Sequence, residues 1–195
     1  MKHKHALLFL LIVILSVTPL AHTEGVSSEP DTIRLLLDSR AHRSFLNEPI
    51  KQEDLDTIIA CGLRAPSAVN AQPWHFTVVK NREIADAVLG YSTNGTVIVI
   101  SVLPGSGLDD LEHPVSVFDC GLATQAMHIA AQALGLGANI FWAPVAHVNE
   151  TMRDTLAIPD GYEALMIMAV GYVDMDAVSS ATSRNDINGM VNYID

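Results

Sequence analysis

The spacing of hydrophobic positions predicts a chain in which amphipathic helices alternate with buried strands. Residues 31–38 and residues 52–64 each repeat apolar side chains at helical intervals. The expected inward stripes are Ile33, Leu36 and Leu37 in the first helix and Leu55, Ile58, Ile59 and Leu63 in the second. Asp31 is placed to cap the first helix, and Pro66 ends the second because the residue before a proline avoids the helical conformation.

The remaining elements follow from the same patterns. Residues 96–103 form an unbroken β-branched run, which predicts a strand covered on both faces. Residues 115–134 predict a long helix that is apolar on most faces and therefore belongs at the centre of the fold or at a subunit interface. Further strands are expected at residues 75–80, 139–145, 164–173 and 190–194, and further helices at 83–89 and 149–156, the last capped by Asn149. Together these elements predict an α+β domain with a central sheet wrapped by helices.

The first residues of the chain have the pattern of an export signal. Two early lysines precede a fifteen-residue, mostly apolar stretch over residues 6–20, which is shorter than the roughly 20 residues of a transmembrane helix. We therefore predict that residues 1–23 are a signal peptide or a membrane anchor, residues 24–30 a polar tether, and residues 31–195 one folded domain. The expected location is periplasmic, extracellular or membrane-anchored.

Composition narrows the classes of function. The chain has 195 residues, a formal net charge of -11 and 49% hydrophobic residues, so it is neither a disordered chain nor a protein with the basic surface that nucleic-acid binding requires. Cys61 and Cys120 lie within predicted apolar helices and are interpreted as core residues, although an exported location would permit a disulfide. The histidines lack the short spacing of metal ligands, and no metal site is expected.

Two segments carry candidate chemistry. Arg34, Arg40 and Arg43 lie close together in an acidic chain, and guanidinium groups suit phosphate oxygens, although arginines on a helix face are often merely solvated. Residues 65–74 contain two prolines and small residues that let a flat ligand approach the backbone. Within them, Asn70 offers an amide that both donates and accepts hydrogen bonds, as the edge of a heterocycle requires. The alternative interpretation of this segment is a plain helix-to-strand connection.

These two segments resemble those of the nitroreductase-like flavoproteins. Residues 40–45 are similar to the family's Arg-Ser-x-Arg-x-Phe motif, and residues 65–74 match its Ala-Pro-Ser-x-x-Asn-x-Gln-Pro-Trp motif. Residues 118–137 are similar to its central dimer helix, and residues 170–172 with the late Arg184 are similar to its last core strand and terminal phosphate-binding arginine. The resemblance covers essentially the whole chain after the predicted N-terminal segment.

The resemblance implies a homodimeric α+β sandwich with a central, mainly antiparallel sheet and FMN bound at the subunit interface. The cofactor-binding residues implied by position are Arg40, Ala41, Arg43, Pro66, Ser67, Ala68, Asn70 and Arg184. Of these, Arg40 and Arg184 would hold the FMN phosphate, Arg43 and Asn70 would lie at the pyrimidine edge, and the small residues would line the ring. Ala41 replaces the motif's serine and so removes one phosphate partner.

The activity implied by the resemblance is that of an FMN-dependent oxidoreductase. Hydride would pass from NADH, NADPH or another donor through the flavin to a small electron-poor acceptor such as a nitroaromatic or a quinone. No side chain is singled out as a catalytic acid or base. Because reduced nicotinamide is scarce outside the cytoplasm, the alternative is an exported flavin-binding electron carrier or a redox-inert relative without NAD(P)H turnover.

Overall fold

The computed structural model describes residues 31–105, 114–177 and 182–194. The predicted signal segment and tether, and most of the loop after residue 104, lie outside these residues. The helices are α1 (Asp31–Asp38), α2 (Gln52–Leu63), α3 (Arg82–Leu89), α4 (Val115–Ala133) and the single turn α5 (Val145–His147). Further helical turns lie at Ala68–Asn70, Val148–Met152, Met175–Ala177 and Ile187–Gly189. The strands are β1 (Trp74–Val79), β2 (Thr96–Val102), β3 (Gly137–Phe141) and β4 (Glu163–Gly171).

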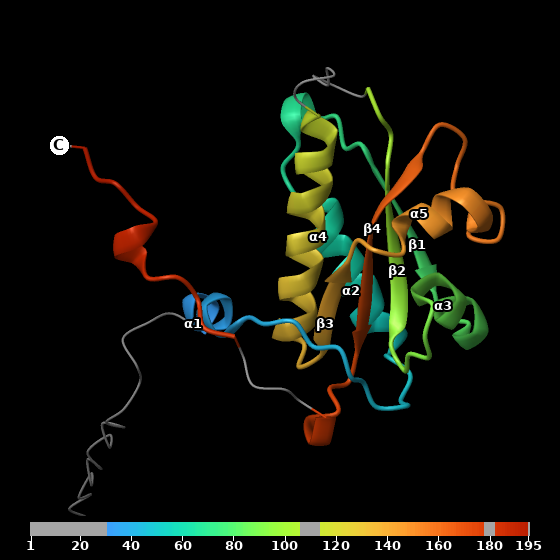
Figure 1. Ribbon diagram of the computed structural model, residues 1–195, viewed down its shortest axis with the longest axis horizontal. Coiled ribbons are helices and arrows are strands. Elements are labelled where there is room, and N and C mark those ends of the chain that lie inside the picture. Colours follow the sequence, from blue (N-terminus) through green and yellow to red (C-terminus); the bar gives the residue numbers. More distant parts are fainter. Residues whose placement is uncertain (1–30, 106–113, 178–181, 195) are drawn as a thin grey trace, which may run out of the picture. The chain divides into compact units, whose positions relative to one another are not determined.

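The four strands form one sheet in the order β1-β2-β4-β3, and every neighbouring pair is antiparallel (Figure 1). This confirms the central antiparallel sheet. In β2, six consecutive residues from Val97 to Val102 are buried, as expected for a strand covered on both faces. β1 and β3 are the edges of the sheet, and the segment that carries the arginines lies next to β3, where the His42 N–H donates to the Ala138 carbonyl at 2.8 Å.

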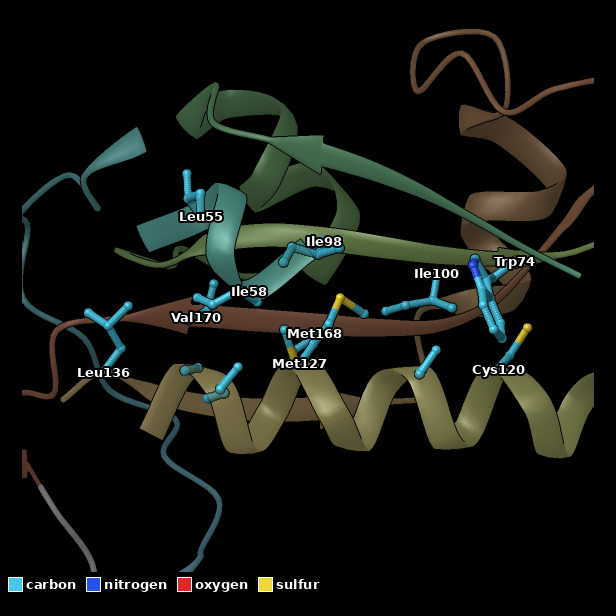
Figure 2. Close-up of a cluster of buried hydrophobic side chains, with 14 of the residues drawn as sticks. Leu55, Ile58, Trp74, Ile98, Ile100, Cys120, Met127, Leu136, Met168 and Val170 are labelled. Atoms are coloured by element: carbon cyan, nitrogen blue, oxygen red, sulfur yellow. The ribbon is translucent and has the colours of Figure 1, made fainter. Parts of the chain in front are cut away.

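Each face of the sheet has its own hydrophobic core. On one face, α2 and α4 cover the sheet, and Figure 2 shows Ile58 of α2, Met127 of α4 and Met168 of β4 pointing toward one another. On the other face, α3 and the turn after α5 pack against the alternate residues of the strands. The alternation is that of a strand, in which successive side chains point to opposite faces. The fold is therefore a helix–sheet–helix sandwich.

The first helix corrects one expectation about burial. α1 has the predicted bounds, but it begins at Asp31, and the stripe of Ile33, Leu36 and Leu37 is exposed, with Leu37 69% accessible. Its apolar face is real, yet nothing within the described part of the chain covers it. An apolar stripe shows that a surface avoids water, and it does not show which surface covers it.

The segment after β3 corrects two further expectations. β3 ends at Phe141 and not at residue 145, because Pro144 starts the turn that leads into α5. Asn149 does not cap a helix. It lies inside the helical turn, where its amide donates to the Ala164 carbonyl at 2.9 Å and accepts from the Ala164 N–H at 2.8 Å. The side chain thus fixes this turn to the start of β4.

Three smaller findings complete the fold. Residues 190–194 are exposed and form no strand, so that expectation is wrong for the single chain. Cys120 is buried in the core under α4 and Cys61 is half-buried against it, which agrees with their interpretation as core residues. Among the described residues, no helix combines the length and the apolar character needed to cross a membrane.

Because α2 and α4 are in close contact at Gly62, we expect a larger side chain there to destabilise the fold. A Cβ on Gly62 would lie 2.7 Å from Met127 Cγ, so the Gly62→Val side chain must displace the methionine from the core. We expect the free energy of unfolding to fall by about 1–3 kcal/mol, the usual cost of overpacking. Chemical denaturation measures this. Ala60→Val, at an exposed position of the same helix, is the control and should cost less than about 1 kcal/mol; equal losses in both variants would contradict the packing argument.

Candidate functional site

A cavity of about 500 Å³ lies beside α4 and β3 and gathers most of the chain's candidate phosphate ligands. Among the described residues, those that line it are Leu36, Ser39, Arg40, Ala41, Arg43, Gln125, His128, Asn139, Ile140 and Arg184. Three of them are arginines and none is a carboxylate. The volume falls within the range of small-molecule sites. In a chain with a net charge of -11, this local excess of positive charge favours an anionic ligand.

The segment that carries two of the arginines is anchored through Phe45. The ring is buried against two glycines: a Cβ on Gly95 would lie 2.9 Å from it, and one on Gly171 would lie 3.0 Å away. Any larger residue at these glycines would displace the ring. The backbone on either side is tied to the chain after β4, since Leu46 N–H donates to the Tyr172 carbonyl and Asp174 N–H donates to the Ser44 carbonyl.

Arg40 is held at both its backbone and its side chain. The Gln132 side-chain amide, near the end of α4, donates to the Arg40 carbonyl at 3.2 Å and to the Ser39 hydroxyl at 3.1 Å. The Arg40 Nε donates to His42 Nε2 at 3.2 Å. These contacts place the guanidinium at the cavity before any ligand binds, which lowers the entropy lost on binding.

Two histidines, His42 and His128, lie beside the arginines, and the pKa of each is lowered. Burial lowers the pKa of His42 and the neighbouring Arg40 charge lowers it further, while an interaction with the Arg40 backbone opposes these two causes without reversing them. Burial is also the main cause of the lowered pKa of His128, against a smaller raising effect of the Ala138 backbone. Both rings are therefore neutral near pH 7. Within the described residues, His42 Nδ1 is buried without a hydrogen-bond partner, at a cost of about 1–3 kcal/mol.

Arg184 reaches the same region from the C-terminal part of the chain. It lines the main cavity and an adjoining hollow of about 440 Å³ that also contacts Asp38, Ser39 and Arg40. Its only hydrogen bond within the described residues goes from Nη1 to the Thr182 carbonyl at 3.3 Å. Within the same residues, none of the three cavity arginines has an acidic partner, so no ion pair of the described chain neutralises their charge.

The second candidate segment has a strained backbone. Val69, Asn70 and Gln72 all have positive φ angles, of 47°, 59° and 48°. Asparagine tolerates this region, but a β-branched residue there is a true outlier that costs on the order of 1–3 kcal/mol. The segment is held by Asp119 of α4, whose two carboxylate oxygens each accept from the Ala68 N–H at 3.2 Å. Strain of this kind, fixed by a buried carboxylate, is typical of functional segments.

The structure therefore separates the predicted site residues into two groups. Arg40, Ala41, Arg43 and Arg184 line the cavity together. Pro66, Ser67, Ala68 and Asn70 do not line it, because their segment contacts α4 at Asp119 whereas the arginine segment contacts α4 at Gln132. At roughly 1.5 Å per helical residue, these two contacts are about 20 Å apart along α4. One chain does not bring the two motifs into one cavity.

Three polar residues of the cavity were not predicted from the sequence. Gln125 and His128 lie on one side of α4 with Gln132, three and four residues apart, and Asn139 lies in β3 and is buried. Polar side chains at helical spacing within a mostly apolar helix are a signal that the hydrophobic pattern does not explain. That signal would have pointed to this side of α4.

The sequence of this chain matches a known protein family. The model of the nitroreductase family matches residues 37–103 and 104–172 of the chain. The chain belongs to the nitroreductase family. The match includes both motifs, the whole sheet and α4, so it confirms the resemblance; it ends before Arg184.

Relatives of this nitroreductase-family chain agree over most of their length. A protein of Archaeoglobus fulgidus with the provisional name NADH dehydrogenase/NAD(P)H nitroreductase is 30% identical over 73% of this chain and 85% of its own. The FMN reductase [NAD(P)H] of Bacillus subtilis is 25% identical over 84% of this chain and 75% of its own. A solved nitroreductase with bound FMN from Bacteroides fragilis has the same fold, with a TM-score of 0.73 at 19% identity, over 86% of this chain and all of that one.

Because Asp119 accepts from the Ala68 N–H, we expect its removal to destabilise the strained segment of this nitroreductase-family chain. Asp119→Ala removes the only acceptor of the Ala68 N–H that the described residues provide. We expect the free energy of unfolding to fall by about 1.5–3 kcal/mol, the usual worth of a hydrogen bond to a charged group. Chemical denaturation measures the loss, with Asp56→Ala on the exposed side of α2 as the control. A loss no larger than the control's would show that Asp119 does not hold the segment.

Proposed function

We propose that this nitroreductase-family chain binds FMN at the arginine cavity and acts as an NAD(P)H-dependent oxidoreductase on small electron-poor acceptors such as nitroaromatics or quinones. The observation that carries the proposal is the group of Arg40, Arg43 and Arg184 around one cavity, without acidic partners among the described residues. Such a group is electrostatically unfavourable unless an anion joins it. A phosphate monoester fits because guanidinium groups offer paired donors to its oxygens.

The names of the relatives support the flavin and the nicotinamide. They include an NAD(P)H nitroreductase and an FMN reductase that uses NAD(P)H, and structural neighbours contain bound FMN. In the proposed site, Arg40 and Arg184 bind the phosphate and Arg43 lies at the pyrimidine edge of the ring. When bound, FMN supplies the two-electron chemistry between a nicotinamide donor and the acceptor.

The chain's own contribution is positioning and electrostatics. The three arginines neutralise the phosphate and stabilise negative charge on the reduced ring, and their attachment to the sheet and to α4 fixes where that charge lies. Ala41 lines the cavity where the family motif has a serine, so the proposed site has one hydroxyl donor fewer. No described side chain is assigned the role of a catalytic acid or base.

We propose further that a second copy completes the site. Pro66, Ser67, Ala68 and Asn70 would line the flavin held by the arginines of the other subunit, because the two motifs lie about 20 Å apart along α4 in one chain. An exposed apolar face supports this assembly: Phe118 and Leu122 of α4 are 66% and 49% accessible, one helical turn apart. Apolar surface of this kind is typical of interfaces.

Binding of two flavins tests the site. We expect Arg184→Ala to weaken FMN binding by about tenfold to a hundredfold, the equivalent of one charge-assisted hydrogen bond, without affecting riboflavin, which lacks the phosphate. Asn70→Ala should weaken both flavins because the amide is assigned to the ring. Quenching of flavin fluorescence measures the affinities. Unchanged affinity for FMN in both variants would exclude this placement of the pocket.

Redox titration of the holoprotein separates an enzyme from a carrier. NADH or NADPH should bleach the flavin absorbance under anaerobic conditions, and a nitroaromatic or quinone should restore it. A stable yellow protein that reacts with neither nicotinamide would favour the electron carrier, and a protein that binds no flavin would favour the redox-inert relative.

Native mass spectrometry of the protein from its host tests the assembly and the N-terminus together. We expect a dimer with two FMN molecules, and Leu122→Glu should convert it to a flavin-free monomer because a buried unpaired carboxylate is costly at an interface. Val78→Glu, at an exposed apolar position of the edge strand β1, is the control. We also propose that residues 1–23 direct export. The mass separates a chain cleaved after residue 23 from an intact anchored one, and a dimeric Leu122→Glu protein would refute this interface.

A further inference from the structure

The hydrogen bond between Arg40 and His42 defines the state of both side chains. A guanidinium group has only donors, so His42 Nε2 must accept the hydrogen bond from Arg40 Nε across 3.2 Å. The imidazole is then neutral and carries its proton on Nδ1, the buried atom without a partner among the described residues. The hydrogen bond thus requires one tautomer of one protonation state.

His42 itself is held firmly enough to orient another side chain. Its N–H donates to the Ala138 carbonyl of β3 at 2.8 Å. Its Cβ packs against Gly137, where an added Cβ would lie only 2.7 Å away, so the glycine is what lets the imidazole approach the strand. The ring is therefore fixed to the edge of the sheet on the side that faces the cavity arginine.

The hydrogen bond to His42 limits which N–H donors of Arg40 can bind an anion. Nε is engaged by His42, and the backbone carbonyl is engaged by Gln132. Within residues 31–105, 114–177 and 182–194, the two terminal nitrogens of Arg40 have no hydrogen-bond partner. Only this end-on pair can bind an anion through two parallel hydrogen bonds, because the side-on pair requires Nε. The imidazole thus selects one of the two binding geometries of the guanidinium.

We propose that His42 is a positioning residue for the flavin phosphate: its neutral imidazole holds Arg40 by Nε and presents the end-on pair of guanidinium nitrogens to the cavity. This rests on the proposed function, since it assigns the phosphate of FMN to Arg40. It gives a role to a residue at the variable position of the arginine motif. The burial and the Arg40 charge that lower the pKa of His42 keep the ring neutral, and so able to accept, at physiological pH.

The test compares FMN with riboflavin in two substitutions of His42. His42→Leu keeps the apolar contact with Gly137 but removes the acceptor, and we expect FMN affinity to fall about threefold to tenfold with riboflavin affinity unchanged. His42→Gln places a carbonyl oxygen near the position of Nε2 and should restore FMN affinity to within about twofold of wild type. Fluorescence quenching measures both ligands, and the melting temperature of the apo-protein checks that each variant is folded.

A double-mutant cycle separates positioning from a general effect on packing. In the Arg40→Ala background, His42→Leu should change FMN affinity by less than about twofold, because the imidazole acts only through the guanidinium. An equal effect of His42→Leu with and without Arg40, an equal loss of both flavins, or an unchanged FMN affinity in the single variant would each overturn the proposal. If the wild-type protein bound neither flavin, the proposed function would fail together with it; loss of the His42 effect alone leaves that function intact.

Discussion

The attachment of residues 40–45 to the sheet is the constraint on which the cavity depends. Phe45 fits against Gly95 and Gly171, and His42 is bonded to β3, so Arg43, which lies between them, has little freedom to move away from the cavity. Arg40, two residues before His42, is held by Gln132 and by the His42 ring. Like charges held at one cavity repel each other, and folding must supply the energy that keeps them together. The core contacts of Phe45 provide part of it. An anion relieves the repulsion, which makes the cavity selective for one sign of charge before any specific contact is considered.

α4 determines how the two motifs are related in space. It packs over the sheet through one face, and its length separates Asp119, which holds the strained segment, from Gln132, which holds the arginine segment. A helix is rigid over this distance, so the two segments cannot approach each other within one chain. The same helix exposes Phe118 and Leu122. Separation of the motifs and exposure of an apolar face are thus two consequences of one element, and both favour assembly with a second copy.

Backbone strain is concentrated in the second motif. Of the four non-glycine residues with positive φ in the described chain, Val69, Asn70 and Gln72 belong to the second motif. Next to the cavity, His42 has a buried nitrogen without a partner among the described residues. The two cores, by contrast, consist of closely packed apolar side chains. Folding energy from the cores therefore supports the strain in the second motif, as is usual in functional proteins. Buried atoms without a partner among the described residues also occur in the sheet, at His75 and Ser101.

Local pattern in the sequence predicted the first four helices, the places of the four strands and both motifs, because periodicity records which side of each element avoids water and motif residues are neighbours in the chain. It also predicted a strand at 190–194 and a helix at 149–156 that the structure does not have. It did not predict the partner of Asn149, which is a backbone group in a strand that follows later in the chain. Nor did it predict that His128 and Asn139 would join Arg184 at one cavity, or that the apolar stripe of α1 would stay uncovered. These depend on how elements pack against each other, and packing is set by the shapes of surfaces that are distant in sequence, which no local pattern contains.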